Sequence, residues 1–455
     1  MKQIILLCII ASLFIGCAAS RYNIANKYLE NGQTQLALRE YLKILHEDKR
    51  QHGGFTDIQA MLGAASAYLA MNKFSKTQGL CKRILKIDSN NGGALFYAGR
   101  SLEANQKKKW AIKFYKRYRL LPDYDPYKRF MIARLEMLMQ EEIAKNIRAA
   151  IRRERNIRTD DFPKNTIAVL YFINQDQDPE WEPLSKGIAE MIITDLAQVK
   201  KLKVVERIKL QKLIDEMNFV QSDLANPKTV PRFGKLLRAR TLVNGGFTIP
   251  GGTDFLLTSN ISDVDGAKSF EASRFSGNLQ NIFNLEKDIV MNVLDQLGVE
   301  LSYEERDRIM RIPTRDFQAF VKYCNGLEQM DRGNYSMAAE YFQSALKLDP
   351  NFILAQQKFQ VVDAMYTLAS GRPITAGIRL ASRSAAAGQP PGLPPQLAKH
   401  PQLTSSGRLG RISTNLDLGY LPGNDGRKDA AELRSANVSL DRSKLPEPPD
   451  PPTSR

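Results

Sequence analysis

Apolar residues recur at helical spacing along the first third of the chain. Three stretches share a pattern of two amphipathic helices joined by a short polar turn. Aligning Ala37, Thr77 and Ala111 as equivalent positions gives periods of 40 and 34 residues, and a fixed period of this length is typical of repeat architectures. The longer step indicates an insertion at residues 47–57. The pattern predicts three helical repeats followed by one or two further helices over residues 127–158.

A fourth repeat unit lies near the other end of the chain, at Ala319–Phe352. Small residues at Gly326 and Ala338 are expected where its two helices cross, with Phe342 packed into the crossing. Pro350 is expected to end the second helix, because proline cannot continue one. Gly326, Gly333, Tyr335, Ala338, Phe342, Ala345 and Pro350 fall at the spacings of a tetratricopeptide repeat, which this unit resembles.

Tetratricopeptide arrays usually bind peptides or proteins in a concave groove lined by the first helix of each repeat. The resemblance therefore implies a partner-binding surface in the N-terminal repeats. The alternative for any single position is an ordinary surface or inter-repeat contact. By register, the predicted partner-binding residues are Tyr22, Asn26, Gln59, Ser66, Phe96, Arg100 and Glu103.

Between the two groups of repeats the periodicity becomes mixed. The apolar run Thr166–Phe172 predicts a buried strand, and the sequence "LSKGIAEMIITDLAQV" after it predicts a helix. A second strand, two helices and three antiparallel strands follow, the latter joined across Gly251-Gly252 and Asp265-Gly266. A helix at Leu279–Leu297 closes the region. This order predicts a mixed sheet with helices packed against it.

The sequences "IAVLYFIN", "GIAEMIITDLAQVKKLKVVERIKLQKLIDEM" and "GKLLRARTLVNGGF" resemble the domain of the curli secretion channel CsgG. That domain is similar to the TolB N-terminal domain and to FlgO-type lipoproteins. The resemblance covers residues 165–298 and implies a role in assembly or export at the cell envelope. The secretion channel extends its hairpins through the membrane, whereas the hairpins here are compact and have no aromatic belt. We therefore expect no pore, and an oligomeric secretion channel component remains the alternative.

The N-terminus carries a targeting pattern. Lys2 precedes an apolar run at residues 4–15, which is too short to span a bilayer but fits a signal peptide. Gly16-Cys17 at its end resembles the lipobox of bacterial lipoproteins, with Phe14 where that family usually has Leu. The resemblance implies acylation of Cys17, and Ala18 in place of Asp implies an outer-membrane anchor facing the periplasm. The alternative is an ordinary secretory signal.

Composition separates the last 87 residues from the rest of the chain. They hold 12 of the 22 prolines and a single aromatic residue, Tyr420. Such a segment buries too little apolar surface to offset its ordering entropy, which predicts a disordered tail. The predicted organisation is a signal peptide at 1–16, repeats at 17–158, the αβ domain at 159–300, the C-terminal repeat at 301–368 and the tail at 369–455.

The net charge of +16 is concentrated in residues 106–158, where 16 Lys and Arg face 6 Asp and Glu, a net of +10. Behind a signal peptide the expected counterparts are anionic lipids, lipopolysaccharide phosphates or an acidic protein, and no nucleic acid is expected. The alternative is a solvated face with no dedicated partner. Cys81 and Cys324 are expected to be buried free thiols.

No nucleophile elbow, phosphate loop or metal-ligand spacing is present, so we expect no catalytic residue, metal or cofactor. Glu206-Arg207 and Asp195 lie at strand and helix ends, where acid–base residues can occur, but the Glu206-Arg207 pair is interpreted as fixing a helix start or an ion pair. The predicted fold class is α+β multidomain, with tetratricopeptide repeats flanking a CsgG-like mixed-sheet domain. The predicted function is a non-enzymatic envelope lipoprotein that acts as a protein assembly scaffold, with a second copy of the chain among its candidate partners.

Overall fold

The computed structural model describes residues 21–47, 55–219, 221–224, 226, 229–265, 272–370 and 374. The predicted signal peptide, Cys17 and the proline-rich tail beyond Ser370 lie outside these residues, apart from Ile374. The described chain divides into two compact units. Unit 1 comprises residues 21–138 with 364–370 and 374, and unit 2 comprises residues 139–363.

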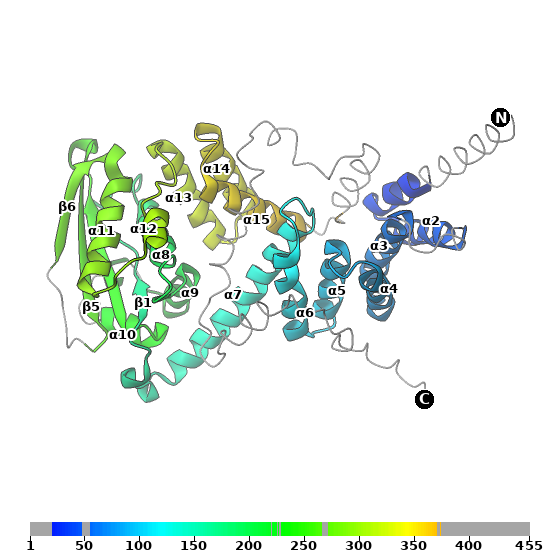
Figure 1. Cartoon of the computed structure of the whole chain (residues 1–455), viewed down its shortest axis with the longest axis horizontal. Helices are drawn as coiled ribbons and strands as arrows, with labels where there is room; N and C mark the ends of the chain where they lie inside the picture. Colours follow the sequence, from blue (N-terminus) through cyan, green and yellow to red (C-terminus); the bar gives the residue numbers. More distant parts are fainter. Residues whose placement is uncertain are drawn as a thin grey trace. The chain divides into compact units, whose positions relative to one another are not determined.

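Unit 1 is built from consecutive helical hairpins (Figure 1). A helical segment at residues 21–30 contacts Tyr41 of the next helix through Tyr22 and Asn26, and each later helix packs on the one before it. The elements are α2 (Thr34–Glu47), α3 (Phe55–Ala70), α4 (Phe74–Ile87), α5 (Gly92–Ala104), α6 (Lys108–Tyr115), a 3-10 helix η1 (Lys116–Leu120) and α7 (Lys128–Arg152).

The backbone confirms the repeat register. Gly32, Asn72, Gln106 and Gly333 each adopt a left-handed conformation, with φ of 73°, 57°, 59° and 77°. Each lies five positions before the small residue that aligned the repeats. The amide of the following residue donates to a carbonyl five residues back, at 2.8 to 2.9 Å, which closes the helix end as in a Schellman motif. The four hairpins therefore share one turn geometry.

Glycines permit the close helix crossings. A Cβ on Gly326 would lie 2.5 Å from the Phe342 ring, and one on Gly99 would lie 2.4 Å from the Tyr115 ring. These two contacts have the same 16-residue separation, as repetition requires. Thr77 replaces the usual Ala, and its hydroxyl donates at 3.3 Å to the carbonyl oxygen of Ala65, so the buried oxygen is satisfied.

Unit 2 holds a mixed six-stranded sheet of order β3-β1-β4-β5-β6, with β2 also pairing with β4. β1, β2 and β3 run parallel to their partners, and β4, β5 and β6 form an antiparallel meander. The strands are β1 (Thr166–Val169), β2 (Ile173–Asn174), β3 (Lys203–Val204), β4 (Thr241–Thr248), β5 (Asp254–Asp263) and β6 (Ser273–Asn278).

The helices of unit 2 follow the predicted order. α8 and α11 pack against each other and contact the sheet, and α13 packs on α8 (Figure 1). Helices α13 and α14 form the predicted C-terminal repeat hairpin. The bounds are α8 (Leu184–Leu196), α9 (Arg207–Met217), α10 (Val230–Leu237), α11 (Ile282–Gln296), α12 (Tyr303–Ile309), α13 (Phe317–Asp331), α14 (Tyr335–Leu348) and α15 (Ile353–Ala369), with 3-10 turns η2 (Glu154–Asn156), η3 (Thr159–Asp161), η4 (Gln221–Leu224), η5 (Pro250–Gly252) and η6 (Leu279–Asn281).

The structure departs from the predicted single strand Thr166–Phe172. Val169 pairs with Val243, but the next pair is Ile173 with Gly246. From Val169 to Ile173 the chain advances four residues, whereas from Val243 to Gly246 on β4 it advances three. The one extra residue forms a bulge. A bulge redirects side chains, and this one lies at the position from which Tyr171 projects.

The predicted boundary between an αβ domain and a separate C-terminal repeat falls inside unit 2. Gly187 on α8 allows the contact with α13, because a Cβ there would lie 2.1 Å from the Cys324 sulfur and 3.0 Å from the Phe320 ring. The ring of Phe320 also contacts that of Phe283 on α11, with centroids 5.4 Å apart. The hairpin is thus packed into the helical layer of the αβ domain.

Candidate functional site

A polar crevice lies at the carboxyl ends of β1 and β3. The chain passes from β1 through α8 to β3, which lies on one side of β1 in the sheet. From β3 it passes to β4, which lies on the other side of β1. The two connections therefore leave β1 and β3 in opposite directions along the sheet. Ligands of open parallel sheets commonly bind beside such a reversal.

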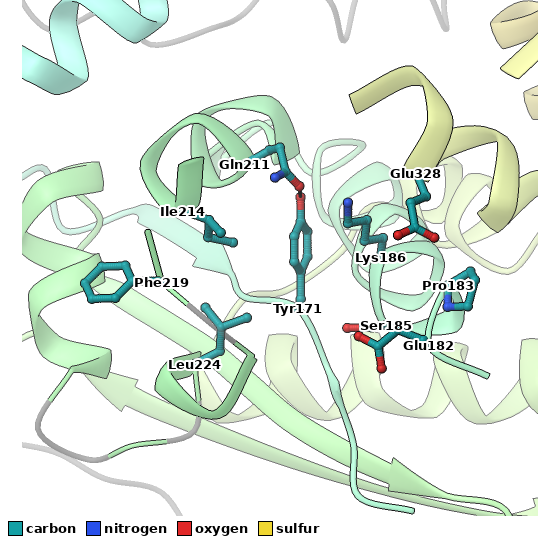
Figure 2. A pocket seen from close by; sticks show the side chains of 10 residues that line it. All are labelled: Tyr171, Glu182, Pro183, Ser185, Lys186, Gln211, Ile214, Phe219, Leu224 and Glu328. Carbon is teal, nitrogen blue, oxygen red and sulfur yellow. Dashed lines mark hydrogen bonds between the residues drawn. The ribbon is translucent and has the colours of Figure 1, made fainter. Parts of the chain in front are cut away.

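The crevice encloses a cavity of about 160 Å³. Figure 2 shows Tyr171 at its centre, between an apolar wall and a polar wall. Burial and the nearby Glu328 carboxylate raise the pKa of Glu182. The apolar wall comprises Ile214, Phe219 and Leu224, and the polar side comprises Glu182, Ser185, Lys186, Gln211 and Glu328, with Pro183 at the start of α8.

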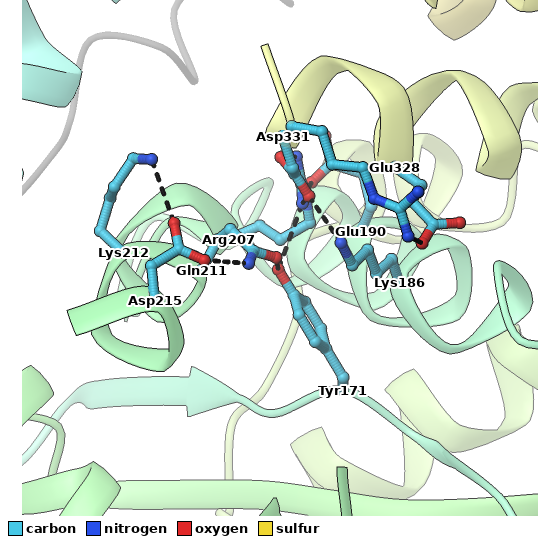
Figure 3. Close-up of polar contacts among 10 residues, drawn as sticks. Tyr171, Lys186, Glu190, Arg207, Gln211, Lys212, Asp215, Glu328 and Asp331 are labelled. Carbon is cyan, nitrogen blue, oxygen red and sulfur yellow. Dashed lines mark hydrogen bonds and ion pairs between the residues drawn. The ribbon is translucent and has the colours of Figure 1, made fainter. Parts of the chain in front are cut away.

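Beside the cavity, five charged side chains form an ionic cluster: Lys186, Glu190, Arg207, Asp331 and Lys358. Figure 3 shows the first four of them. The Arg207 guanidinium donates to both Asp331 oxygens, at 2.6 and 2.9 Å, and through Nε to Glu190 at 3.1 Å. Lys186 lies 3.1 Å from Asp331, and Lys358 lies 3.0 Å from Glu190. Every member has an opposite charge within reach.

Tyr171 connects this cluster to α9. Its hydroxyl accepts from Arg207 at 3.2 Å and donates to Gln211 at 2.9 Å. The Gln211 amide in turn donates to Asp215 at 2.8 Å. Burial raises the pKa of Tyr171, so the phenol keeps its proton and serves as a fixed donor.

The cluster holds its carboxylates ionised. Burial alone would raise the pKa of Asp331, but Arg207 and Lys186 hold it below the ordinary value of 3.8. Lys358 and Arg207 likewise outweigh burial and lower the pKa of Glu190. A lowered carboxyl pKa gives stability that is present above the ordinary pKa and is lost as the pH falls below it. The cluster therefore holds α13 most firmly at neutral pH.

The contacts indicate positioning rather than reaction. Arg207 and Asp331 have side-chain exposures of 5% and 3%, and their bidentate pairing joins the first turn of α9 to the last turn of α13. Glu206 occupies the N-cap position of α9 but makes no side-chain capping bond. The interpretation of Arg207 as an ion-pair residue is confirmed. Within the part of the chain that the structure describes, no three His, Cys, Asp or Glu side chains are grouped as metal ligands.

A second buried cluster lies between α8 and α11. The Lys287 amine donates to Asp195 and lies 3.1 Å from a Glu286 oxygen, and Glu286 has no exposed surface. Burial, reinforced by Glu286, raises the pKa of Asp195. Burial also raises the pKa of Glu286, against the opposing effect of Lys287. Two carboxyl groups thus share one amine, and Asp195 is engaged in an ion pair.

Glu286→Gln is expected to raise the Tm of unit 2 at pH 8 and to leave it nearly unchanged at pH 4.5. A carboxyl group with a raised pKa binds more protons in the folded state, so its burial costs stability as the pH rises above the ordinary value of 4.5. The amide removes that cost. Thermal unfolding followed by circular dichroism at both pH values measures it, with the exposed Asp307→Asn as control. A larger gain at pH 4.5 would contradict the assignment.

The structure places five of the seven predicted partner-binding residues in the interior of unit 1. Tyr22, Asn26, Gln59, Ser66 and Phe96 are at most 7% exposed. Their polar groups make intramolecular contacts: the Tyr41 hydroxyl donates to Asn26 at 2.6 Å, and the Tyr22 hydroxyl donates to Gln59 at 3.4 Å. The Phe96 ring packs against Tyr97, Tyr115, Tyr127 and Phe130.

Glu103 and Arg100 lie at the end of α5. The Glu103 carboxylate accepts from Tyr115 at 2.9 Å and pairs with Arg134, which leaves its side chain 12% exposed. Arg100 lies 3.5 Å from Glu103 and keeps 31% of its side chain exposed. Of the seven, Arg100 is the most accessible to a partner. Partner binding by these positions stays a prediction, and Cys17 lies outside the described residues.

Sequence signals for the ionic cluster were weaker than those for the repeats. Lys186, Glu190 and Lys358 occur in helices with ordinary charge patterns, and Asp331 lies beside the repeat signature at a position the signature does not include. An arginine that is buried at a strand end requires an anionic partner. Arg207 was therefore the residue from which a buried ion pair could have been inferred. The predicted free thiols are confirmed, since Cys81 and Cys324 are both buried.

The comparisons with known proteins follow this division. The family model described as "Curli production assembly/transport component CsgG" matches residues 149–249, from the end of α7 to the residue after β4. "Putative adenylate cyclase 3" of Rhizobium meliloti (strain 1021) is 23% identical over 205 residues, which are 44% of this chain and 32% of that relative. The aligned segment therefore spans about a third of the relative's length.

Among solved structures, the crystal structure of yeast Tom70 aligns with 82% of this chain and 72% of its own, at 14% identity and a TM-score of 0.23. A score of that size does not establish a common arrangement. Among the described helices, none has the length and apolar character needed to cross a membrane. The chain thus combines helical-hairpin repeats with a domain similar to CsgG over residues 149–249.

Proposed function

We propose that this protein is a non-enzymatic lipoprotein of the bacterial envelope that acts as a scaffold for secretion or assembly at the outer membrane. In this proposal Cys17 carries the acyl anchor and the repeats of unit 1 bind envelope proteins. The CsgG-like domain supplies an assembly surface that includes self-association. The predicted location is the periplasmic face of the outer membrane.

The supporting observation is the ionic cluster at the carboxyl edge of the sheet. In this crevice, where α/β domains commonly bind ligands, Arg207 and Lys186 are engaged by Asp331 of the repeat hairpin. These charges fix one structural element against another. A site whose charges are consumed in this way favours mechanical coupling of a repeat to a CsgG-like domain over catalysis.

The second candidate is a component of an oligomeric secretion channel. It is favoured by the match of residues 149–249 to a family described as an assembly and transport component. The two candidates differ in what purified protein does. A scaffold forms stoichiometric complexes with other envelope proteins, whereas a channel component forms detergent-resistant rings that conduct ions in planar bilayers.

The full chain is expected to incorporate radiolabelled palmitate in bacterial cells, and Cys17→Ser is expected to lose the label. Crosslinking mass spectrometry on the same cells is expected to recover envelope proteins linked to unit 1, including at lysines near Arg100. Cys81→Ser is the matched control for loss of a thiol, because Cys81 is buried and its pKa is raised to about 12.

Persistence of the label in Cys17→Ser would refute the anchor while leaving the scaffold to be judged by the crosslinks. Crosslinks confined to cytosolic proteins would refute the scaffold in the envelope. Rings with conductance would favour the channel component instead.

A further inference from the structure

The outer face of α6 and η1 in unit 1 combines dense positive charge with exposed apolar side chains. Between Gln106 and Pro122 the chain has seven Lys and Arg and no Asp or Glu. Within unit 1, this segment packs through α6 against α5.

The helical register separates the two faces. Ala111, Tyr115 and Tyr118 are buried on the inner side. The opposite, outer side of the segment carries Lys109, Trp110, Lys113 and Leu120, which share one exposed face. Trp110 and Leu120 are each 42% exposed, so large apolar surfaces lie between the lysines.

Lys113 lies directly over the indole ring of Trp110. The Lys113 amine lies 4.6 Å from the centroid of the Trp110 ring. A little further along the chain, Tyr124 is 50% exposed. Tryptophan and tyrosine rings favour the layer between lipid headgroups and acyl chains, and flanking lysines are attracted by anionic headgroups. The same mixture on one helix is typical of surfaces that lie on membranes.

Other anionic partners fit this face less well. Single-stranded nucleic acid is usually bound in a basic groove whose aromatic rings stack on bases. Here the basic side chains lie on the outer side of a helix, and Leu120 offers an aliphatic surface that does not stack. An acidic protein would need an apolar contact matched to Trp110 and Leu120. A lipid interface supplies both the charge and the apolar layer.

We propose that the face formed by Lys109, Trp110, Lys113 and Leu120 docks on an anionic lipid surface. The two ammonium groups lie at the headgroup phosphates, and the indole and leucine enter the interfacial layer. This contact does not depend on acylation of Cys17, and it gives the positive segment of unit 1 a specific partner. It would hold the repeat array against the membrane while unit 2 is free of that role.

The test uses the full chain with Trp181→Phe, which leaves Trp110 as its single tryptophan, since the chain has two. Phosphatidylcholine vesicles with 30 mol% phosphatidylglycerol are expected to shift Trp110 emission to the blue. Acyl-brominated lipids in the same vesicles are expected to quench it. Pure phosphatidylcholine vesicles are expected to do neither. The readout is local to α6, so attachment through the N-terminus alone does not produce it.

Lys109→Ser with Lys113→Ser is expected to weaken binding to the anionic vesicles about 25-fold, from about fivefold for each lysine at an anionic surface. Lys27→Ser with Lys43→Ser removes the same charge elsewhere in unit 1 and is expected to bind as the parent does. Trp110→Ala, read by vesicle sedimentation, is expected to weaken binding as well.

Quenching that is absent with brominated lipids would overturn the proposal. So would equal binding by the Lys109/Lys113 and Lys27/Lys43 variants. Inorganic phosphate without vesicles is expected to leave Trp110 emission unchanged, and an equal shift would point to a free anion instead. Single-stranded RNA that binds without lipid and protects Trp110 from quenching by acrylamide, while the vesicles do not, would assign the face to nucleic acid.

Discussion

Asp331→Ala is expected to lower the free energy of unfolding of unit 2 by about 3–5 kcal/mol, because it leaves the Arg207 guanidinium buried without its bidentate partner. Arg207 is 5% exposed on its side chain, so water cannot replace the lost carboxylate. For a unit of this size, a loss of that order lowers the Tm by roughly 10 °C. Thermal and urea unfolding of the full chain measure the change.

The matched control is Asp307→Ala, which breaks the Asp307–Arg311 pair. Both of its side chains are more than half exposed, so the free energy of unfolding is expected to change by less than about 0.5 kcal/mol. The double variant Arg207→Met with Asp331→Leu removes both charges and is expected to recover most of the loss. If Asp331→Ala unfolds like the Asp307 control, the ionic cluster does not hold α13 on the αβ domain.

Gly187→Ala is expected to destabilise unit 2 by about 1–3 kcal/mol, the usual cost of overpacking a close contact. The added methyl group would overlap the Cys324 sulfur, and the Phe320 ring and the Cys324 Cβ bound the remaining space at 3.0 and 3.4 Å. Combining it with Cys324→Ala removes the overlapping sulfur and is expected to restore part of the stability. Thermal unfolding of the single and double variants measures the coupling.

Gly79→Ala is the matched control, because Gly79 is a helical glycine whose Cβ would meet nothing within 4 Å. Alanine there is expected to stabilise unit 1 by about 0.5–1 kcal/mol through higher helix propensity. A Gly187→Ala variant as stable as its parent would show that α8 and α13 are not in close contact. The absence of any rescue by Cys324→Ala would place the overlap elsewhere.

Both experiments address one structural feature, the junction between the CsgG-like domain and the repeat hairpin. Asp331 contributes its charge to the junction, and Gly187 permits its close packing. If the proposed scaffold transmits partner binding from the hairpin to the αβ domain, it does so across these contacts. Loosened variants are then expected to keep their acyl label and lose crosslinks.

Local sequence patterns were sufficient for the elements and for the repeat register. The small residues at Ala37, Ala111 and Ala338 aligned the hairpins, and the left-handed turns five residues earlier confirm that alignment. The order of strands and helices in the middle region was also predicted, since alternation and helical spacing are properties of short windows. The bulge after Val169 was not, because it is defined only by pairing with β4.

The predicted groove residues show the limit of assigning binding positions from the repeat register alone. Tyr22, Asn26 and Gln59 fall on the expected helices, yet the structure gives their polar groups partners inside unit 1. A register position specifies a helix and a face, but the side chain's exposure depends on how the neighbouring helices pack over it. Of the seven, Arg100 keeps the most exposure, although Glu103 lies nearer the end of the same helix.

The sequence by itself determined the helical repeats, the mixed αβ region, the basic segment and the two buried thiols, because each is encoded by residues close together in the chain. The tertiary structure decided which charges meet: Arg207 and Asp331 lie 124 residues apart, and neither residue's surroundings indicate the other. Hydrophobic periodicity fixes an element and its buried face, whereas a long-range ion pair exists only once two faces have packed. For that reason the repeats could be predicted from the sequence, but the packing of the α13–α14 hairpin on the αβ domain could not.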